Sequence, residues 1–160
     1  MSETHLVMDS PVGRLRLRTD GENVTELMFC DDPVEASDAP ALLEAARQLA
    51  EYFAGERTEF DLPLRPAGTD FQCGVWAELL NIPYGETVSY GQIATRLGLP
   101  LTASRAVGLA NGSNPISIVV PCHRVIGADG TLVGFGGGLD NKRILLELEA
   151  RVRIQHEFAP

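Results

Sequence analysis

The chain has 160 residues, enough for one sizeable core or two small domains, and its composition of 44% hydrophobic and 22% charged residues is ordinary. It has no signal-peptide pattern and no apolar run near the ~20 residues of a membrane helix, so we expect a cytoplasmic protein without a membrane partner. A formal net charge of −9 argues against nucleic acid, and three cysteines with three histidines, all widely spaced, argue for free thiols and against a metal site.

The charge is unevenly distributed along the chain. Residues 1–86 carry 17 acidic and 6 basic side chains, whereas residues 87–160 carry 5 acidic and 7 basic ones. No Asp or Glu lies between Thr87 and Ala128, a stretch that holds Arg96, Arg105 and Arg124. The local charge of a surface decides where phosphates bind. On charge alone, however, a neutral surface with ordinary arginines is the favoured interpretation.

The first 67 residues have the patterns of a small α/β domain. In residues 6–19, apolar and polar residues alternate on both sides of a Ser-Pro-Val-Gly turn, which predicts a hairpin. Residues 23–29 predict a third strand. An apolar stripe over residues 41–53 predicts a helix that ends at Gly55. Residues 58–64 alternate again and predict another strand. Residues 65–68, Arg-Pro-Ala-Gly, are the best candidate for a linker.

The second region carries stronger local signals. Thr69 with Gln72, and Ser89 with Gln92, are capping boxes that predict helices near residues 70–81 and 90–97. Thr102 is predicted to cap a third helix over residues 103–110. Two short helices joined by a Gly-containing turn are typical of a helix-turn-helix, although such pairs are also common in proteins that do not bind DNA.

The third helix is rich in small residues and contains Gly108 in its interior. A glycine there weakens a helix by ~1 kcal/mol relative to alanine, so packing or contact must explain it. One interpretation is close packing against another helix. The other is a low-profile face that enters a groove, with Arg105 as the projecting side chain. The residues alone leave both open.

An apolar segment, residues 115–120, leads directly into Pro121-Cys122-His123-Arg124. A buried cysteine is usually an inert hydrophobe, but polar residues directly behind an apolar run indicate the edge of a site. A thiol needs a base or a positive neighbour to become a nucleophile. His123 can reach Cys122 only through a turn or a bridging water. A glycine-rich loop follows, then a last helix capped by Asp140 or Asn141, and a loosely packed tail over residues 151–160.

These motifs together resemble the O6-alkylguanine-DNA alkyltransferases, also called methylated-DNA–protein-cysteine methyltransferases. The resemblance is densest over residues 69–149 and rests on several short motifs in a specific arrangement. They are Ile82-Pro83-Tyr84-Gly85-Glu86-Thr87, Ser89-Tyr90, Arg105-Ala106-Val107-Gly108, Ala110-Asn111, Asn114-Pro115, Pro121-Cys122-His123-Arg124-Val125, and the glycine-rich loop into Lys142, Leu145-Leu146 and Glu149. The resemblance implies an α+β protein in which a ribonuclease-H-like domain (1–67) precedes a mainly helical, winged helix-turn-helix-like domain (68–150).

The resemblance also implies roles for the matching residues. Cys122 is similar to the alkyl acceptor, His123 to a general base that acts through a water, and Glu149 to the residue that orients it. Asn114 resembles a hinge residue between the recognition region and the active-site turn. Tyr90 resembles the tyrosine that crowds the target phosphate, and protonation of the leaving base is assigned to it.

Arg105 resembles the arginine that fills the base stack after the damaged nucleotide leaves it, and the helix that carries it would enter the minor groove. Further DNA or lesion contacts are implied for Ser104, Ala106, Gly108, Arg124 and Phe135. The expected partner is duplex DNA that contains O6-alkylguanine or O4-alkylthymine. The implied reaction is an irreversible, single-turnover transfer to Cys122 by a monomer that needs no cofactor or metal.

The chain departs from the family pattern at two points. Phe135 stands where the family often has tyrosine, which affects lesion selectivity, and the ligands of the N-terminal zinc site of some members are not apparent. Two alternatives remain: a lesion-binding relative without transfer activity, which would typically lack Cys122, and a Cys-His hydrolase that turns over without DNA.

Overall fold

The computed structural model describes residues 4–158, which form two compact units. The first contains the chain up to Ala67 together with Pro115–Val119, and the second contains Gly68–Asn114 and the chain from Val120 onward. Sequence analysis assigned Pro115–Val119 to the second domain. The segment joins the first unit because Leu27 N donates to Pro115 O and Ser117 N donates to Leu27 O, both at 2.9 Å. Sequence patterns do not reveal such pairing between distant segments.

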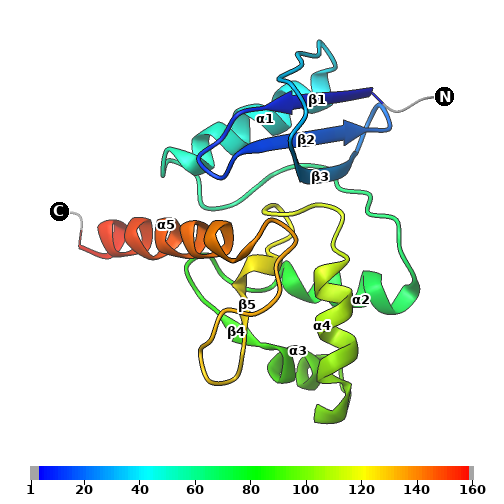
Figure 1. Ribbon diagram of the computed structural model, residues 1–160, viewed down its shortest axis with the longest axis vertical. Coiled ribbons are helices and arrows are strands. Elements are labelled where there is room, and N and C mark those ends of the chain that lie inside the picture. Colours follow the sequence, from blue (N-terminus) through cyan, green and yellow to red (C-terminus); the bar gives the residue numbers. More distant parts are fainter. Residues whose placement is uncertain (1–3, 159–160) are drawn as a thin grey trace. The chain divides into compact units, whose positions relative to one another are not determined.

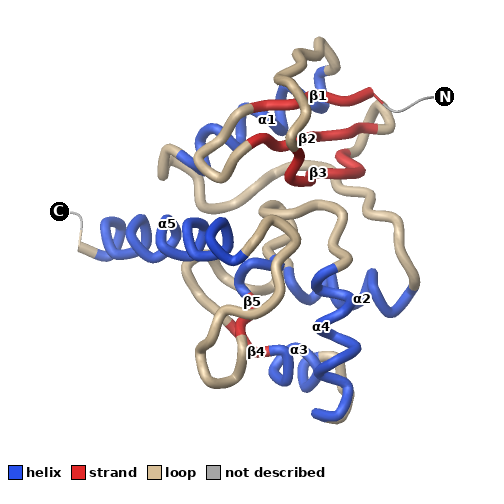
Figure 2. Tube along the Cα trace, in the orientation of Figure 1, coloured by secondary structure: helices blue, strands red, loops and turns tan. Residues whose placement is uncertain are grey.

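The first unit is a three-stranded antiparallel sheet with a helix against one face (Figures 1 and 2). Its elements are β1 (Thr4–Met8), β2 (Arg14–Thr19), β3 (Val24–Cys30) and α1 (Pro40–Phe53). The predicted hairpin, third strand and helix are therefore confirmed. Strand residues alternate in burial, so Leu15, Leu17 and Leu27 meet Leu42 and Leu49 of α1 in a core where all five have no exposed surface.

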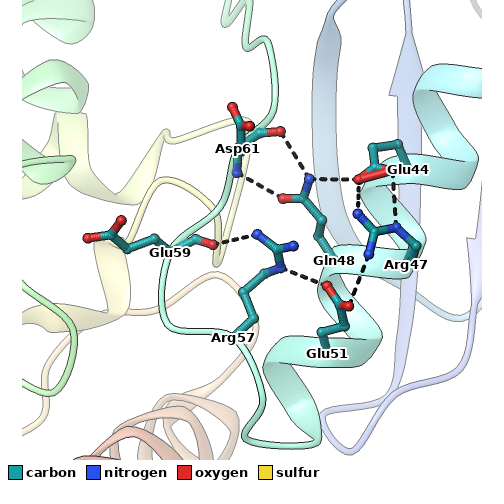
Figure 3. A network of polar contacts seen from close by, with 7 residues as sticks. All are labelled: Glu44, Arg47, Gln48, Glu51, Arg57, Glu59 and Asp61. Atoms are coloured by element: carbon teal, nitrogen blue, oxygen red, sulfur yellow. Dashed lines mark hydrogen bonds and ion pairs between the residues drawn. The ribbon is translucent and has the colours of Figure 1, made fainter.

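The strand predicted over residues 58–64 is wrong: within the described chain this segment makes only an isolated bridge between Leu64 and Val24. Gln48 of α1 and Arg57, which lies beyond the end of that helix, hold the segment instead (Figure 3). Gln48, only 2% exposed, donates to Asp61 O at 3.0 Å and accepts from Asp61 N at 2.9 Å. Arg57 donates to Glu59 O at 2.9 Å. The amide of Gln48 thus satisfies backbone groups that a neighbouring strand would otherwise pair.

The second unit is mainly helical (Figure 2). Its elements are α2 (Asp70–Leu79), β4 (Val88–Ser89), α3 (Tyr90–Arg96), α4 (Ser104–Gly112), β5 (Val125–Ile126) and α5 (Leu139–Glu157), and the two short strands pair in parallel. Both predicted capping boxes are present, at Thr69 and at Ser89. None of the helices in residues 4–158 combines the length and the apolar character that crossing a membrane requires.

α3 and α4 pack against each other as the predicted helix pair. Gly98 lies at a φ of +73°, which lets the chain turn back so that Leu99 N bonds Ala94 O at 2.9 Å. The predicted cap at Thr102 is wrong, because Thr102 lies inside a 3-10 turn, Leu101–Ala103, and α4 starts from Ala103 without a side-chain cap.

The end of the chain also differs from the prediction. α5 begins after Gly138, so neither Asp140 nor Asn141 caps it, and Asn141 Nδ2 instead donates to Gly137 O at 2.9 Å. The helix continues to Glu157 through the residues expected to form a loose tail. It does so because its buried stripe reaches Val152, which is 2% exposed and follows Leu145 by two helical turns.

Candidate active site

Cys122 begins a single 3-10 turn, Cys122–Arg124, directly behind the buried apolar segment. The turn is closed by bonds from Cys122 N to Val120 O at 2.8 Å and from Arg124 N to Pro121 O at 3.0 Å. Two asparagines at the end of α4 hold its carbonyls: Asn114 Nδ2 donates to Val120 O at 2.8 Å, and Asn111 Nδ2 donates to Cys122 O at 3.4 Å. Cys122 is only 4% exposed, and these hydrogen bonds fix the backbone of the turn that carries it.

His123 and Arg124 point to one carboxylate, that of Glu149 on α5. His123 Nε2 donates to Glu149 Oε2 at 2.6 Å. Arg124 donates Nε to Oε1 at 2.8 Å and Nη2 to Oε2 at 3.1 Å, which is the two-pronged geometry that a guanidinium makes with a carboxylate. Gly85 N adds a fourth bond to Oε1 at 3.2 Å. Four donors therefore satisfy one buried carboxylate.

The protonation states follow from this arrangement. Burial alone would raise the pKa of Glu149, but the hydrogen bond from His123 and the hydrogen bonds and charge of Arg124 outweigh it and lower that pKa. Burial lowers the pKa of His123, and the nearby cations Arg124 and Lys142 act in the same direction against the attraction of Glu149. We therefore assign an ionised Glu149 and a neutral His123. With Nε2–H on Glu149, Nδ1 is the acceptor nitrogen, and it has no hydrogen-bond partner among residues 4–158.

A second group of residues gathers at the carbonyl of Val133 in the glycine-rich loop. The Tyr90 hydroxyl donates to Val133 O at 3.2 Å, and Lys142 Nζ donates to the same oxygen at 2.8 Å and to Val125 O at 2.7 Å. Burial raises the pKa of Tyr90, and the charge of the Cys122 thiolate raises it further. The same thiolate charge acts on Lys142. Tyr90 and Lys142 thus share a carbonyl of the glycine-rich loop and both lie within electrostatic reach of Cys122.

The first turns of α4 carry mostly small side chains on their exposed face. Arg105 and Ala106 are exposed and Ser104 is half-buried. A Cβ added at Gly108 would meet only the ring of Tyr90, at 3.7 Å, which is an ordinary van der Waals distance. The small residues are therefore not required by close helix packing at this position. This observation favours the interpretation of an open, low-profile face.

Next to this face lies a groove of about 640 Å³. Its lining includes Tyr90, Gly91, Thr95, Leu101 and Ser104, but not Cys122. Phe135 is half-buried in the glycine-rich loop, where Gly138 N bonds its carbonyl at 3.0 Å.

Of the predicted site residues, His123 is bonded to Glu149, Asn114 bonds the carbonyl of Val120 two residues before Cys122, and Tyr90 bonds the glycine-rich loop. The catalytic roles predicted for them stay predictions. The prediction that Arg124 contacts DNA is wrong, because its residue is 7% exposed and its guanidinium is bonded to Glu149 and to Ile82 O at 2.8 Å.

Lys142 and Asn111 belong to the motifs that resemble the family, but the sequence did not predict a role for either of them at the site. A signal for Lys142 was present in the sequence, since it is the only lysine among 13 lysines and arginines. Cys30, Cys73 and Cys122 form no disulfide, and residues 4–158 contain no cluster of His, Cys, Asp or Glu able to hold a metal ion.

Comparison with known proteins gives matches over nearly the whole chain. Residues 4–66 match the model of the 6-O-methylguanine DNA methyltransferase ribonuclease-like domain, and residues 70–151 match that of the DNA-binding domain. The methylated-DNA–protein-cysteine methyltransferase of Mycobacterium bovis is 56% identical over 148 residues, covering 89% of each chain. That of Methanosarcina acetivorans is 49% identical over 152 residues, covering 91% of this chain and 97% of its own.

Solved structures agree with these matches. The crystal structure of the Mycobacterium tuberculosis O6-methylguanine methyltransferase has a TM-score of 0.85 and 52% identity over 94% of both chains. The crystal structure of Mycobacterium tuberculosis OGT in complex with DNA has a TM-score of 0.85 and 54% identity, covering 92% of this chain and 93% of its own.

Proposed function

Because this chain belongs to the 6-O-methylguanine DNA methyltransferase family, we propose that it repairs DNA by moving an alkyl group from guanine O6 onto its own Cys122. Its activity is that of a methylated-DNA–protein-cysteine methyltransferase, and it binds and acts on DNA. The predicted family and the predicted order of a ribonuclease-like domain followed by a DNA-binding domain are confirmed. The acceptor residue, the single turnover and the way the lesion is reached belong to the proposal.

The observation that carries the proposal is a set of three buried residues: Cys122, its neighbour His123 in the same turn, and Glu149, which is bonded to His123. A thiol with a pKa of ~8.5 is only a few per cent thiolate at neutral pH, so a base has to take its proton. Neutral His123 offers Nδ1 as that base while Nε2 is fixed on Glu149 at 2.6 Å. A water between the sulfur and Nδ1 carries the proton across, which suits a buried acceptor that no described protein group occupies.

The transfer itself is a single displacement. The proton of Cys122 passes to His123, and the thiolate attacks the alkyl carbon on O6 of guanine. The carbon–sulfur bond forms as the carbon–oxygen bond breaks, and its electron pair leaves on the guanine. Tyr90 donates a proton to the departing base, and solvent returns a proton to the tyrosine. The thioether product has no chemical route back to the thiol, so each molecule acts once.

The lesion has to leave the base stack before the sulfur can reach it, at a cost of a few kcal/mol. We assign the compensating contacts to α4, whose exposed Arg105 fills the vacated space while its small residues allow approach to the minor groove. Ser104, Ala106 and Gly108 belong to this contact face, and Phe135 packs against the flipped base. The same pocket chemistry extends to O4-alkylthymine, which presents a comparable alkyl ether.

The test is incubation of the protein with duplex DNA containing O6-methylguanine, followed by peptide mass spectrometry. We expect one methyl group on the peptide that carries Cys122, none on those of Cys30 or Cys73, and product equal in amount to protein. Cys122→Ala should still bind the lesion but take up no methyl group. Binding without modification of the wild type would support a lesion-binding protein, and continuous turnover of an ester without DNA would support a Cys-His hydrolase.

A further inference from the structure

Lys142 is the only lysine of the chain, and every other basic side chain is an arginine. It is also fully buried, with 0% of its surface exposed. Removing an ammonium from water costs several kcal/mol unless partners compensate. A buried, positively charged side chain of this kind therefore calls for a specific explanation.

The partners of Lys142 satisfy two of its three hydrogen-bond donors and do not balance its charge. Nζ donates to Val125 O at 2.7 Å and to Val133 O at 2.8 Å. An ammonium has three donors, and the third has no partner among residues 4–158. Lys142 also forms no ion pair with a carboxylate in this part of the chain, since Glu149 is occupied by His123 and Arg124. The positive charge of Lys142 is therefore unbalanced.

The charge of Lys142 lies at the active-site turn, because Nζ bonds the carbonyl of Val125, the residue that directly follows Cys122–Arg124. Burial lowers the pKa of Lys142, and the Cys122 thiolate opposes that shift. The other titratable groups around the cysteine do not supply a free positive charge. Burial lowers the pKa of His123 toward the neutral imidazole, Arg124 is paired with Glu149, and Tyr90 is an acid whose pKa is raised.

On the basis of the proposed transfer to Cys122, we propose that Lys142 is a positioning residue whose ammonium stabilises the thiolate formed when Cys122 loses its proton, and whose bond to Val133 O holds the glycine-rich loop. The loop carbonyl of Val133 receives both Lys142 Nζ and the Tyr90 hydroxyl. One side chain thus links the ionisation of the nucleophile to the position of the loop that carries Phe135. A purely structural lysine would secure the loop but leave the ionisation of the thiol unchanged.

The first test measures that ionisation without DNA. Alkylation by iodoacetamide is followed against pH by peptide mass spectrometry, with Cys30 and Cys73 as references in the same digest. In Lys142→Met we expect the Cys122 midpoint to move to higher pH, with about tenfold less thiolate at neutral pH. Lys142→Arg should restore most of the effect, and Arg143→Met, one residue away on the exposed face of α5, should have none. An unchanged midpoint in Lys142→Met would overturn the proposal.

The second test leaves the lysine in place, so it applies even where Lys142→Met fails to fold. Because the chain has one lysine, labelling with 13C-lysine gives a single side-chain NMR signal whose pH titration reports on Lys142 alone. Coupling between two groups is reciprocal, so loss of the thiolate must lower the pKa of Lys142. We expect that shift in Cys122→Ser and in the protein methylated on Cys122. Identical titrations in all three forms would overturn the proposal. Since both tests omit DNA, failure of the lesion experiment alone would count against the transfer and not against this coupling.

Discussion

The imidazole of His123 and the carboxylate of Glu149 meet at 2.6 Å with no exposed surface on either side chain. They are 26 residues apart, and α5 brings the carboxylate to the turn that holds the cysteine. The pair gives the histidine a defined tautomer, with Nε2 as the donor and Nδ1 as the acceptor. A base with a defined tautomer is what activation of a neutral thiol requires.

Glu149→Gln should slow methyl transfer by about 10²-fold or more, because the amide no longer holds His123 as a base. It should also destabilise the fold by roughly 3–5 kcal/mol, since Arg124 loses its buried counter-charge. Single-turnover rates on lesion duplex and chemical denaturation measure the two effects. Glu147→Gln is the matched control on the same helix, with a side chain that is 68% exposed. A normal rate in Glu149→Gln would remove this residue from the mechanism.

The neutral state of His123 predicts a stability that falls in acid. Its pKa is lowered in the folded protein by burial, so between that value and the ordinary 6.5 the unfolded chain binds more protons than the folded one. Stability is therefore fully present above pH 6.5 and decreases as the pH falls toward the folded-state pKa. Thermal unfolding between pH 7.5 and about 5 checks this. His123→Gln should show a weaker dependence over that range, and parallel curves would contradict the assignment.

Arg124→Met tests whether Arg124 is a buried partner of Glu149 or a DNA contact. Because its guanidinium is buried on Glu149 and Ile82 O, we expect a loss of roughly 3–5 kcal/mol in stability. At a temperature where the variant is folded, its salt dependence of DNA binding should equal that of the wild type, since no phosphate contact is lost. A smaller slope would show that Arg124 does face DNA. Arg105→Met provides the comparison on the exposed face of α4.

Gly108→Ala separates the two interpretations of the small-residue helix. The new methyl group would sit 3.7 Å from the ring of Tyr90, so it should raise stability by up to ~1 kcal/mol through helix propensity. Affinity for DNA should decrease if this face enters the groove. Gly112→Ala, at the end of the same helix with open space around its Cβ, is the control. A destabilised Gly108→Ala would instead support close packing.

Arg105→Ala should slow repair of a lesion in duplex DNA by about tenfold or more, because each ~1.4 kcal/mol lost from flipping is a factor of ten. The rate with free O6-methylguanine base should stay unchanged, because no stack has to be opened. Comparing the two substrates isolates flipping from chemistry. Arg143→Ala, on the exposed surface of α5, should alter neither rate. Equal slowing on both substrates would point to a damaged active site instead.

The sequence by itself determined the elements whose signals are local. The capping boxes at Thr69 and Ser89, the hairpin and the amphipathic α1 depend on residues a few positions apart, and all are present. Its short motifs also identified the family and named the cysteine, histidine and glutamate that the structure assembles. Motifs of this kind keep their order along the chain, so they remain readable without coordinates.

Tertiary structure alone decided which polar groups are paired in the interior. The sequence could not show that Gln48 would replace a strand partner for Asp61, that Arg124 would turn inward, or that Lys142 would be buried without a carboxylate. Each outcome depends on which groups from distant segments share a low-dielectric interior, where an unpaired charge or backbone group costs several kcal/mol. That pairing is a property of the packed chain, and no window of neighbouring residues contains it.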